Sequence, residues 1–443
     1  MSVNDKMDES ENDMETDSGG ENCSEDQNAS IKTYLPGQAI NNDEELVCDE
    51  STYVLYHQAQ TGAPCLSFDI IQDDLGDNRT EQFPLTAYIV AGSQAERSHV
   101  NNLIVMKMSN MNKVKATEKD EEDESDSDSD DEDQVPELEC ALIHHHGCVN
   151  RVRVTAINNR PLAASWSEMG KVYIWDLSHP LQAVNVPHVM ASYVRNNEAP
   201  KPLFTFTGHQ SEGFAVDWSP TKPGVLATGD CKKNIHLWKP LEGGTWHVDQ
   251  RAYTGHTASV EDLQWSPNEP YVLASCSVDK SIRVWDMRAA PQKACMITTE
   301  DAHELDINVI SWNRKEPFIL SGGDDGVIKV WDLRQFKKES AVATFKHHTA
   351  PITSVEWHPT DSTVYAASGS DDQISLWDLA VERDAEAERT AQEEAELANL
   401  PPQLLFIHQG QTEIKELHWH PQMPGVIIST ALSGFNIFRT ISV

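Results

Sequence analysis

Histidine and aspartate recur along this chain at spacings that suit either catalysis or structure. Six histidines each precede an aromatic residue by 28 to 30 positions: His146, His209, His256, His303, His348 and His408. Three aspartates each lie six residues before a tryptophan that ends an apolar run, in the pairs Asp279 and Trp285, Asp325 and Trp331, Asp371 and Trp377. A histidine beside a carboxylate is a common general base. The same pair also satisfies buried polar groups in structural networks.

Repetition favours the structural interpretation. A third marker recurs between the others, as a tryptophan usually followed by a turn, at Trp218, Trp265, Trp312, Trp357 and Trp419. Three linked markers with a period of about 40–45 residues are typical of β-propeller blades, each a four-stranded antiparallel sheet. In the second marked repeat Lys232 takes the aspartate position, and Lys239 follows Trp238. We therefore expect that blade to be less rigid than the others.

Other catalytic or metal-binding patterns are weak. The run from Cys140 through His144, His145 and His146 to Cys148 matches no familiar zinc-ligand spacing. The sequence contains no phosphate-binding glycine-rich loop, nucleophile elbow or HExxH motif. We expect no enzyme activity, no bound metal and no cofactor.

Charge is distributed unevenly along the chain. The 71 acidic and 34 basic residues give a formal charge of −37, of which residues 1–50, 118–139 and 380–399 carry −13, −13 and −5. The other 351 residues carry only −6. Such a field repels nucleic acid phosphates and attracts basic proteins. We expect a basic protein partner and no direct DNA or RNA binding.

The remaining composition indicates a compartment. No apolar stretch of about 18 residues predicts a membrane span, and the first residues do not form a secretory signal. Eight cysteines without a CxxC pair fit a reducing environment. The sequence is therefore typical of a cytosolic or nuclear protein.

These patterns predict an all-β fold, a seven-bladed WD-repeat β-propeller with an N-terminal helix and acidic disordered insertions. Six marked blades cover residues 140–443, and the strand-like runs at 65–71, 83–92 and 102–108 supply another. The expected organisation by range is an acidic disordered tail (1–43), the helix and first blade (44–117), an acidic disordered insertion (118–139), and blades two to seven (140–443) with a second acidic insertion (381–399).

The unusual segments resemble a known family. The helix-compatible stretch from Glu44, the Ala63-Pro64-Cys65-Leu66-Ser67 run and the block at 83–95 resemble the N-terminal module of the histone-binding WD-repeat proteins. The Tyr34-Leu-Pro-Gly37 element and the tract at 118–139 resemble the glutamate-rich WD-repeat proteins, regulators of ribosome biogenesis, within that class. The resemblance implies a nuclear and nucleolar factor that escorts a basic ribosomal protein, the third of the large subunit, to pre-ribosomal particles. It also implies that the aspartates named above bond the upstream histidines.

The resemblance also implies a groove for a basic helix. Its walls would be Glu382, Asp384, Glu386 and Glu388 on one side, and Leu46, Tyr53, Leu55 and Tyr56 on the other. A solvated acidic helix and simple capping of the propeller flank are the alternatives. Histone binding is the alternative function, although Ala63 stands where the histone binders have tryptophan.

Two further motifs leave alternatives open. Ser125, Ser127 and Ser129 each have an acid three residues on, and phosphorylation there would add charge to a tract that is either a spacer or a polyanion covering a partner. Arg288 and Arg334 complete Trp-Asp-x-Arg patterns like those of substrate receptors of a cullin–RING ubiquitin ligase. An adaptor of that ligase is thus a third expected partner class.

Overall fold

A computed structural model describes residues 34, 46–114, 135–337, 340–383 and 400–443. The chain divides into two units, residues 1–48 and residues 49–443. All helices and strands given below lie in the second unit. Within the described ranges, no helix is long and apolar enough to cross a membrane.

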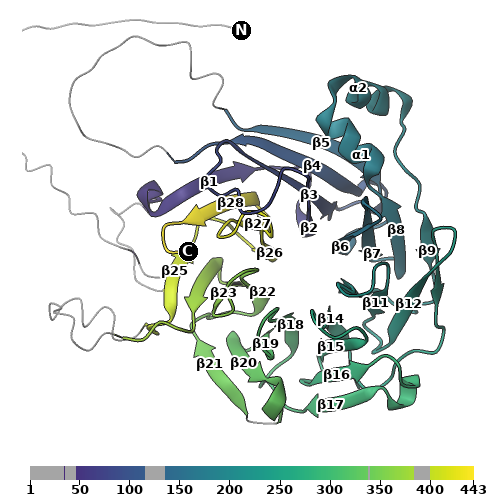
Figure 1. Ribbon diagram of the computed structural model, residues 1–443, viewed down its shortest axis with the longest axis vertical. Coiled ribbons are helices and arrows are strands. Elements are labelled where there is room, and N and C mark those ends of the chain that lie inside the picture. The colour runs from purple at the N-terminus through teal and green to yellow at the C-terminus, as the bar shows by residue number, and fades with distance from the viewer. Residues whose placement is uncertain (1–33, 35–45, 115–134, 338–339, 384–399) are drawn as a thin grey trace, which may run out of the picture. The chain divides into compact units, whose positions relative to one another are not determined.

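The second unit is a ring of seven antiparallel four-stranded sheets, counted over the described residues (Figure 1). The predicted propeller is therefore confirmed. The blade formed by the unmarked region comprises β2 (Cys65–Ile71), β3 (Leu85–Ser93), β4 (Asn102–Met111) and β5 (Glu137–His144). The next blade comprises β6 (Val149–Ile157), β7 (Arg160–Ser167), β8 (Lys171–Asp176) and β9 (Phe204–Phe206).

Four further blades complete most of the ring. The third blade comprises β10 (Ala215–Trp218), β11 (Leu226–Gly229), β12 (Ile235–Leu241) and β13 (Thr245–Val248). The fourth comprises β14 (Val260–Trp265), β15 (Val272–Ser277), β16 (Ile282–Asp286) and β17 (Cys295–Thr299). The fifth comprises β18 (Ile307–Trp312), β19 (Phe318–Gly323), β20 (Val327–Asp332) and β21 (Ala341–Lys346). The sixth comprises β22 (Ile352–Trp357), β23 (Val364–Gly369), β24 (Gln373–Asp378) and β25 (Leu404–His408).

The seventh blade joins the two ends of the described chain. Its inner strands are β26 (Glu416–Trp419), β27 (Ile427–Ala431) and β28 (Gly434–Thr440), and its outer strand is β1 (Tyr53–Ala59). Tyr56 pairs with Phe438 and Ala59 with Phe435. This pairing closes the ring and leaves no unpaired strand edge on β28.

Two expectations about the N-terminal half are wrong. The helix expected after Glu44 is absent from residues 46–59, where a short 3-10 helix (Glu50–Thr52) leads directly into β1. The acidic insertion also ends sooner than expected, because Glu137 and Glu139 belong to β5 and pair with Ser109 and Lys107 of β4.

Two helices were not anticipated. Helices α1 (Ser178–Asn185) and α2 (Pro187–Asn196) connect β8 to β9 and lie at the outer edge of the ring beside β5 (Figure 1). The Tyr88 hydroxyl donates to Asn185 Oδ1 at 2.7 Å, and the Tyr193 hydroxyl donates to the Leu142 carbonyl at 2.8 Å. These bonds fix the helical connection to the first blade.

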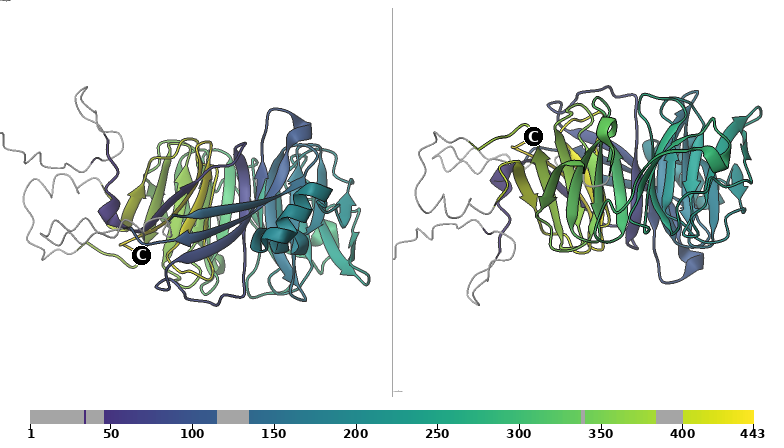
Figure 2. Two further views of the ribbon diagram at one scale, coloured as in Figure 1. Left: turned by 90° about the horizontal axis from the view of Figure 1, so that it is seen from above. Right: turned by 90° about the horizontal axis from the view of Figure 1, so that it is seen from below.

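Strand alternation defines two faces of the ring, between which the strands run in the edge-on views of Figure 2. In every blade the first-to-second and third-to-fourth strand connections meet at one face, which we call the lower face. The remaining connections form the upper face. The core lies between the blades, where Trp238, Trp285, Trp331 and Trp377 are fully buried. Burial of side chains this large contributes about 1.5–3 kcal/mol or more each.

Candidate functional site

The repeated histidines lie inside the blades. In the fourth blade His256 Nδ1 lies 3.0 Å from Asp279 Oδ2, and His256 Nε2 lies 2.6 Å from Ser275 Oγ. The Ser275 hydroxyl also accepts from Trp285 Nε1 at 2.8 Å. The fifth and sixth blades repeat this Trp-Ser-His-Asp chain with His303, Asp325, Ser321 and Trp331, and with His348, Asp371, Ser375 and Trp377. Both ring nitrogens of each histidine are therefore engaged.

Two assignments within this network need correction. His146 is exposed, and it is His145 that is buried, with Nε2 3.0 Å from Ser165 Oγ. In the third blade the acid is present after all: His209 Nδ1 lies 2.9 Å from Asp230 Oδ2, and both side chains are fully buried. Asp230 stands two positions before Lys232, so the expectation of a weakened blade is wrong.

The third marker joins neighbouring blades. The Nε1 groups of Trp218, Trp265, Trp357 and Trp419 each donate to a carbonyl of the preceding blade's innermost strand, at 2.9 to 3.1 Å. The acceptors are Arg153, Asp217, Ser311 and Glu356 in that order. These bonds set the spacing of the innermost strands around the central channel.

A charged cluster fills the channel where the first, second and seventh blades meet. Glu416 Oε1 accepts from Arg151 Nη1 and Arg153 Nη2, both at 2.8 Å. Its Oε2 accepts from the Ser67 hydroxyl at 2.6 Å and the Phe68 amide at 2.8 Å. Burial acts to raise the pKa of Glu416, but the two guanidinium groups hold that pKa well below its usual range. Glu416 therefore stays ionised and links three blades.

Two further channel groups have shifted pKa values. Burial acts to lower the pKa of His418, but the carboxylates of Glu356 and Glu416 outweigh it and raise the pKa to about 10. Burial raises the pKa of Asp217 to about 7, with the neighbouring Asp262 adding to the rise. His418 is thus a cation at neutral pH, whereas Asp217 is partly protonated.

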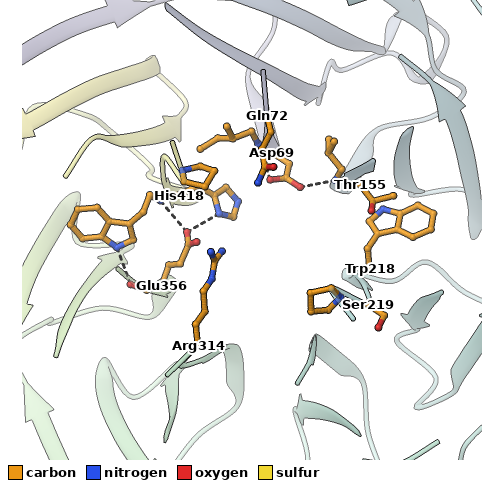
Figure 3. Close-up of a pocket in the computed structure, with 13 residues that line it drawn as sticks. Asp69, Gln72, Thr155, Trp218, Ser219, Arg314, Glu356 and His418 are labelled. Atoms are coloured by element: carbon orange, nitrogen blue, oxygen red, sulfur yellow. Dashed lines mark hydrogen bonds and ion pairs between the residues drawn. The ribbon is translucent and has the colours of Figure 1, made fainter. Parts of the chain in front are cut away.

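A polar cavity of about 270 Å³ opens below this cluster (Figure 3). Asp69 and His418 lie on one side, Thr155 and Trp218 on another, and Arg314 points into the space. The residues that complete its lining, including Ser219 and Pro220, belong to lower-face connections. The cavity is therefore the lower mouth of the channel.

The acidic segments begin and end on the same face. The chain leaves the described residues after Val114, between β4 and β5, and again after Arg383, between β24 and β25. Both are third-to-fourth strand connections, and β1 also starts on the lower face, at Tyr53. The three positions lie in the first, sixth and seventh blades, which are neighbours in the ring.

Contacts around β1 hold these three positions together. The Val114 amide donates to the Val54 carbonyl at 3.1 Å, so the start of the first insertion is attached to β1. The Tyr53 hydroxyl lies 2.8 Å from Nδ1 of His408, at the end of β25. Arg383 Nη2 donates to the Leu400 carbonyl at 3.0 Å and closes the base of the second insertion.

The expected groove residues are placed differently from one another. Leu55 and Tyr53 are 0% and 7% exposed and pack in the core, so they cannot form the wall of a binding groove. Tyr56 is half-buried, and Leu46, in the N-terminal unit, is exposed. The correction follows from β1 being a strand, because its alternate side chains must face the core. Glu382 is exposed, and the other expected acids lie outside the described residues: Asp384, Glu386 and Glu388.

The remaining candidates are exposed or not described. Arg288 and Arg334 extend from the lower face, and each pairs at 2.7 Å with the aspartate of its own Trp-Asp pair. Ser125, Ser127 and Ser129 lie outside the described residues. Across the ranges that the structure describes, no group of three or more His, Cys, Asp or Glu side chains is arranged to hold a metal ion.

Some of these residues carried a sequence signal and others did not. Asp230 directly follows the glycine that ends β11, so scanning that whole turn for an acid would have found it. The Glu416 cluster had no such signal, because its arginines precede it by more than 260 positions.

Comparison with known proteins agrees with this architecture. Residues 43–112 match the family of histone-binding protein RBBP4 and its counterpart in the CAF1 complex. Four segments between 200 and 378 match the WD domain, G-beta repeat.

Three relatives match over most of their length. The chain is 45% identical to ribosome assembly protein rrb1 of Schizosaccharomyces pombe, over 92% of this chain and 84% of that protein. It is 45% identical to protein HEAT STRESS TOLERANT DWD 1 of Arabidopsis thaliana, over 92% and 90%. It is 43% identical to glutamate-rich WD repeat-containing protein 1 of Dictyostelium discoideum, over 90% and 83%. The chain therefore belongs to the WD-repeat family that includes ribosome assembly protein rrb1 and glutamate-rich WD repeat-containing protein 1.

Proposed function

We propose that this protein is a non-enzymatic acidic escort in ribosome biogenesis. It binds a basic large-subunit ribosomal protein, the third, and brings it to pre-ribosomal particles in the nucleus and nucleolus. The observation that carries the proposal is that both acidic insertions and the start of β1 share one face on three adjacent blades. Names of full-length relatives, ribosome assembly protein rrb1 among them, support the same process.

The mechanism is electrostatic. Residues 118–139 and 380–399 carry formal charges of −13 and −5, and residues 1–50, which lead into β1, carry −13. Opposite charge of this density raises association rates with a basic partner, and the effect weakens as salt increases. A rigid propeller keeps the attachment points of the two insertions at fixed separations. Ribosomal RNA carries more negative charge still, so it can displace the escort without ATP.

A competition titration tests the proposal. Immobilised full-length protein is offered the third large-subunit ribosomal protein and a histone tetramer at equal concentration and at about 150 mM salt, where exposed charges more than ~8 Å apart are screened. The proposal expects the ribosomal protein to bind at least tenfold more tightly. Equal binding of both, lost together at slightly higher salt, would show a generic polyanion instead.

Histone binding is the second candidate. It is favoured by the match of residues 43–112, which form β1 to β4, to the histone-binding family. Against it, Tyr53 and Leu55, expected to line the histone-type groove, are buried. Tighter binding of the histone tetramer in the same titration would favour this function over the escort.

A further inference from the structure

Charge on the lower face is separated into two halves. In the described connections of the third, fourth and fifth blades, basic residues outnumber acidic ones by seven to three. In those of the sixth, seventh and first blades, including Asp49 and Glu50 ahead of β1, acidic residues outnumber basic ones by eight to three. A protein with a formal charge of −37 therefore presents a positive half-face opposite its acidic insertions.

An exposed aromatic ring stands within the positive half. Tyr271, in the connection between β14 and β15, is 40% exposed. Lys222 Nζ lies 5.4 Å from the centre of its ring, and the Arg288 guanidinium carbon lies 6.0 Å from it. Cations on an aromatic face at these distances attract the ring and are common in single-stranded nucleic acid sites.

The backbone holds this ring in a costly conformation. Tyr271 has a φ of 127°, which residues other than glycine rarely adopt. Its carbonyl accepts from the Met287 amide at 2.8 Å, and the adjacent Val272 amide donates to the Glu269 carbonyl at 3.3 Å. Strained residues cost about 1–3 kcal/mol and are concentrated at binding sites. The fold thus presents the tyrosine in a fixed position.

Further cations connect this ring to the channel mouth. The side-chain amide of Asn268, in the same connection as Tyr271, donates to the Arg314 carbonyl at 3.2 Å. The guanidinium of Arg314 points into the lower cavity and makes no hydrogen bond or ion pair with the described residues. Lys315 is exposed beside it. Lys222, Tyr271, Arg314 and Lys315, which we call the basic arc, therefore form one continuous surface across three blades.

We propose that the basic arc binds single-stranded RNA, with phosphates on its cations and a base stacked on Tyr271. The net charge of the chain opposes RNA contact over the whole surface, but at physiological salt charges beyond ~8 Å are screened and the local balance decides. An acidic peptide would also contact the cations, but it would gain nothing from a fixed, exposed aromatic ring. The activity is separate from the escort function, since it requires no basic partner.

Fluorescence anisotropy with a labelled single-stranded RNA of about 20 nucleotides tests this on the full chain. The variant K222Q/R314Q/K315Q should weaken binding at least tenfold and lower the slope of log Kd against log salt by about 2, at about 0.7 per phosphate contact. The control K232Q/K233Q/K280Q removes the same charge from the upper face and should bind like the wild type.

Tyrosine variants separate stacking from charge. Tyr271→Ala should weaken binding about tenfold with an unchanged salt slope, and Tyr271→Phe should retain binding. Equal losses in the upper-face control, no binding by the wild type below 100 µM RNA (about the weak limit of non-specific binding), or displacement of the RNA by an equimolar polyglutamate peptide would each overturn the proposal. Because no ribosomal protein is present, these results do not depend on the escort function.

Discussion

Replacing Asp217 with asparagine should stabilise the protein at neutral and alkaline pH. Asp217 Oδ2 accepts a hydrogen bond from the Trp265 amide at 2.7 Å, and an asparagine oxygen can accept the same bond. Burial raises the pKa of Asp217 to about 7, whereas an aspartate in an unfolded chain has a pKa of about 3.9. The folded protein therefore binds this proton more tightly than the unfolded chain does.

The sign and size follow from that difference. The stability contributed by the neutral carboxyl group is fully present below about pH 4 and is lost as the pH rises to about 7. Three pKa units correspond to about 4 kcal/mol as an upper bound, and water in the channel reduces this to about 2–4 kcal/mol. Asp217→Asn removes the loss, so its advantage should be about 1 kcal/mol at pH 5 and about 3 kcal/mol at pH 8.

Urea unfolding followed by tryptophan fluorescence measures this advantage at both pH values. The matched control is Asp74→Asn, which changes an exposed carboxyl group on a lower-face loop and should stay within about 0.5 kcal/mol of the wild type. An Asp217→Asn variant without added stability at pH 8, or with equal gains at pH 5 and pH 8, would refute the reasoning.

Three other predictions concern the same ring of blades. Tyr53→Phe should cost about 1–3 kcal/mol in urea unfolding, because it leaves Nδ1 of buried His408 without its hydroxyl partner; an unchanged midpoint would contradict this role. Asp230→Ala should cost at least about 2 kcal/mol, whereas Lys232→Ala should stay within about 0.5 kcal/mol, and equal effects would show that the third blade lacks the network. Glu416→Gln should cost about 3 kcal/mol at pH 7, because it leaves two buried arginines without their countercharge. Since the pKa of Glu416 is lowered in the folded state, this cost should shrink as the pH falls below about 4, and a pH-independent cost would argue against it.

The marked blades were predictable because their markers are the bonding groups themselves. The interval from His256 to Trp285 is fixed by the Ser275 hydroxyl that bonds both side chains. The strand-like run at 65–71 coincides with β2 because its alternating apolar residues face the core.

What the sequence did not reveal depends on long-range closure. The segment from Tyr53 to Ala59 is compatible with a helix locally, but β28 needs an outer partner and β1 supplies it from the other end of the chain. Local propensity gives way to such pairing, since it buries Leu55 completely. The positive half of the lower face was hidden in the same way, because its cations come from three separate repeats.

The central claim is that acidic segments on the lower face bind the basic partner. The direct test is calorimetric titration of the third large-subunit ribosomal protein into full-length protein whose acids in 118–133 and 384–396 are changed to asparagine or glutamine. A matched control neutralises exposed upper-face acids: Glu96, Glu212, Glu300, Asp301, Glu304 and Glu413. The claim predicts at least a tenfold loss of affinity and a smaller salt dependence in the first variant, with little change in the control. Equal affinity of the first variant and the wild type would contradict it.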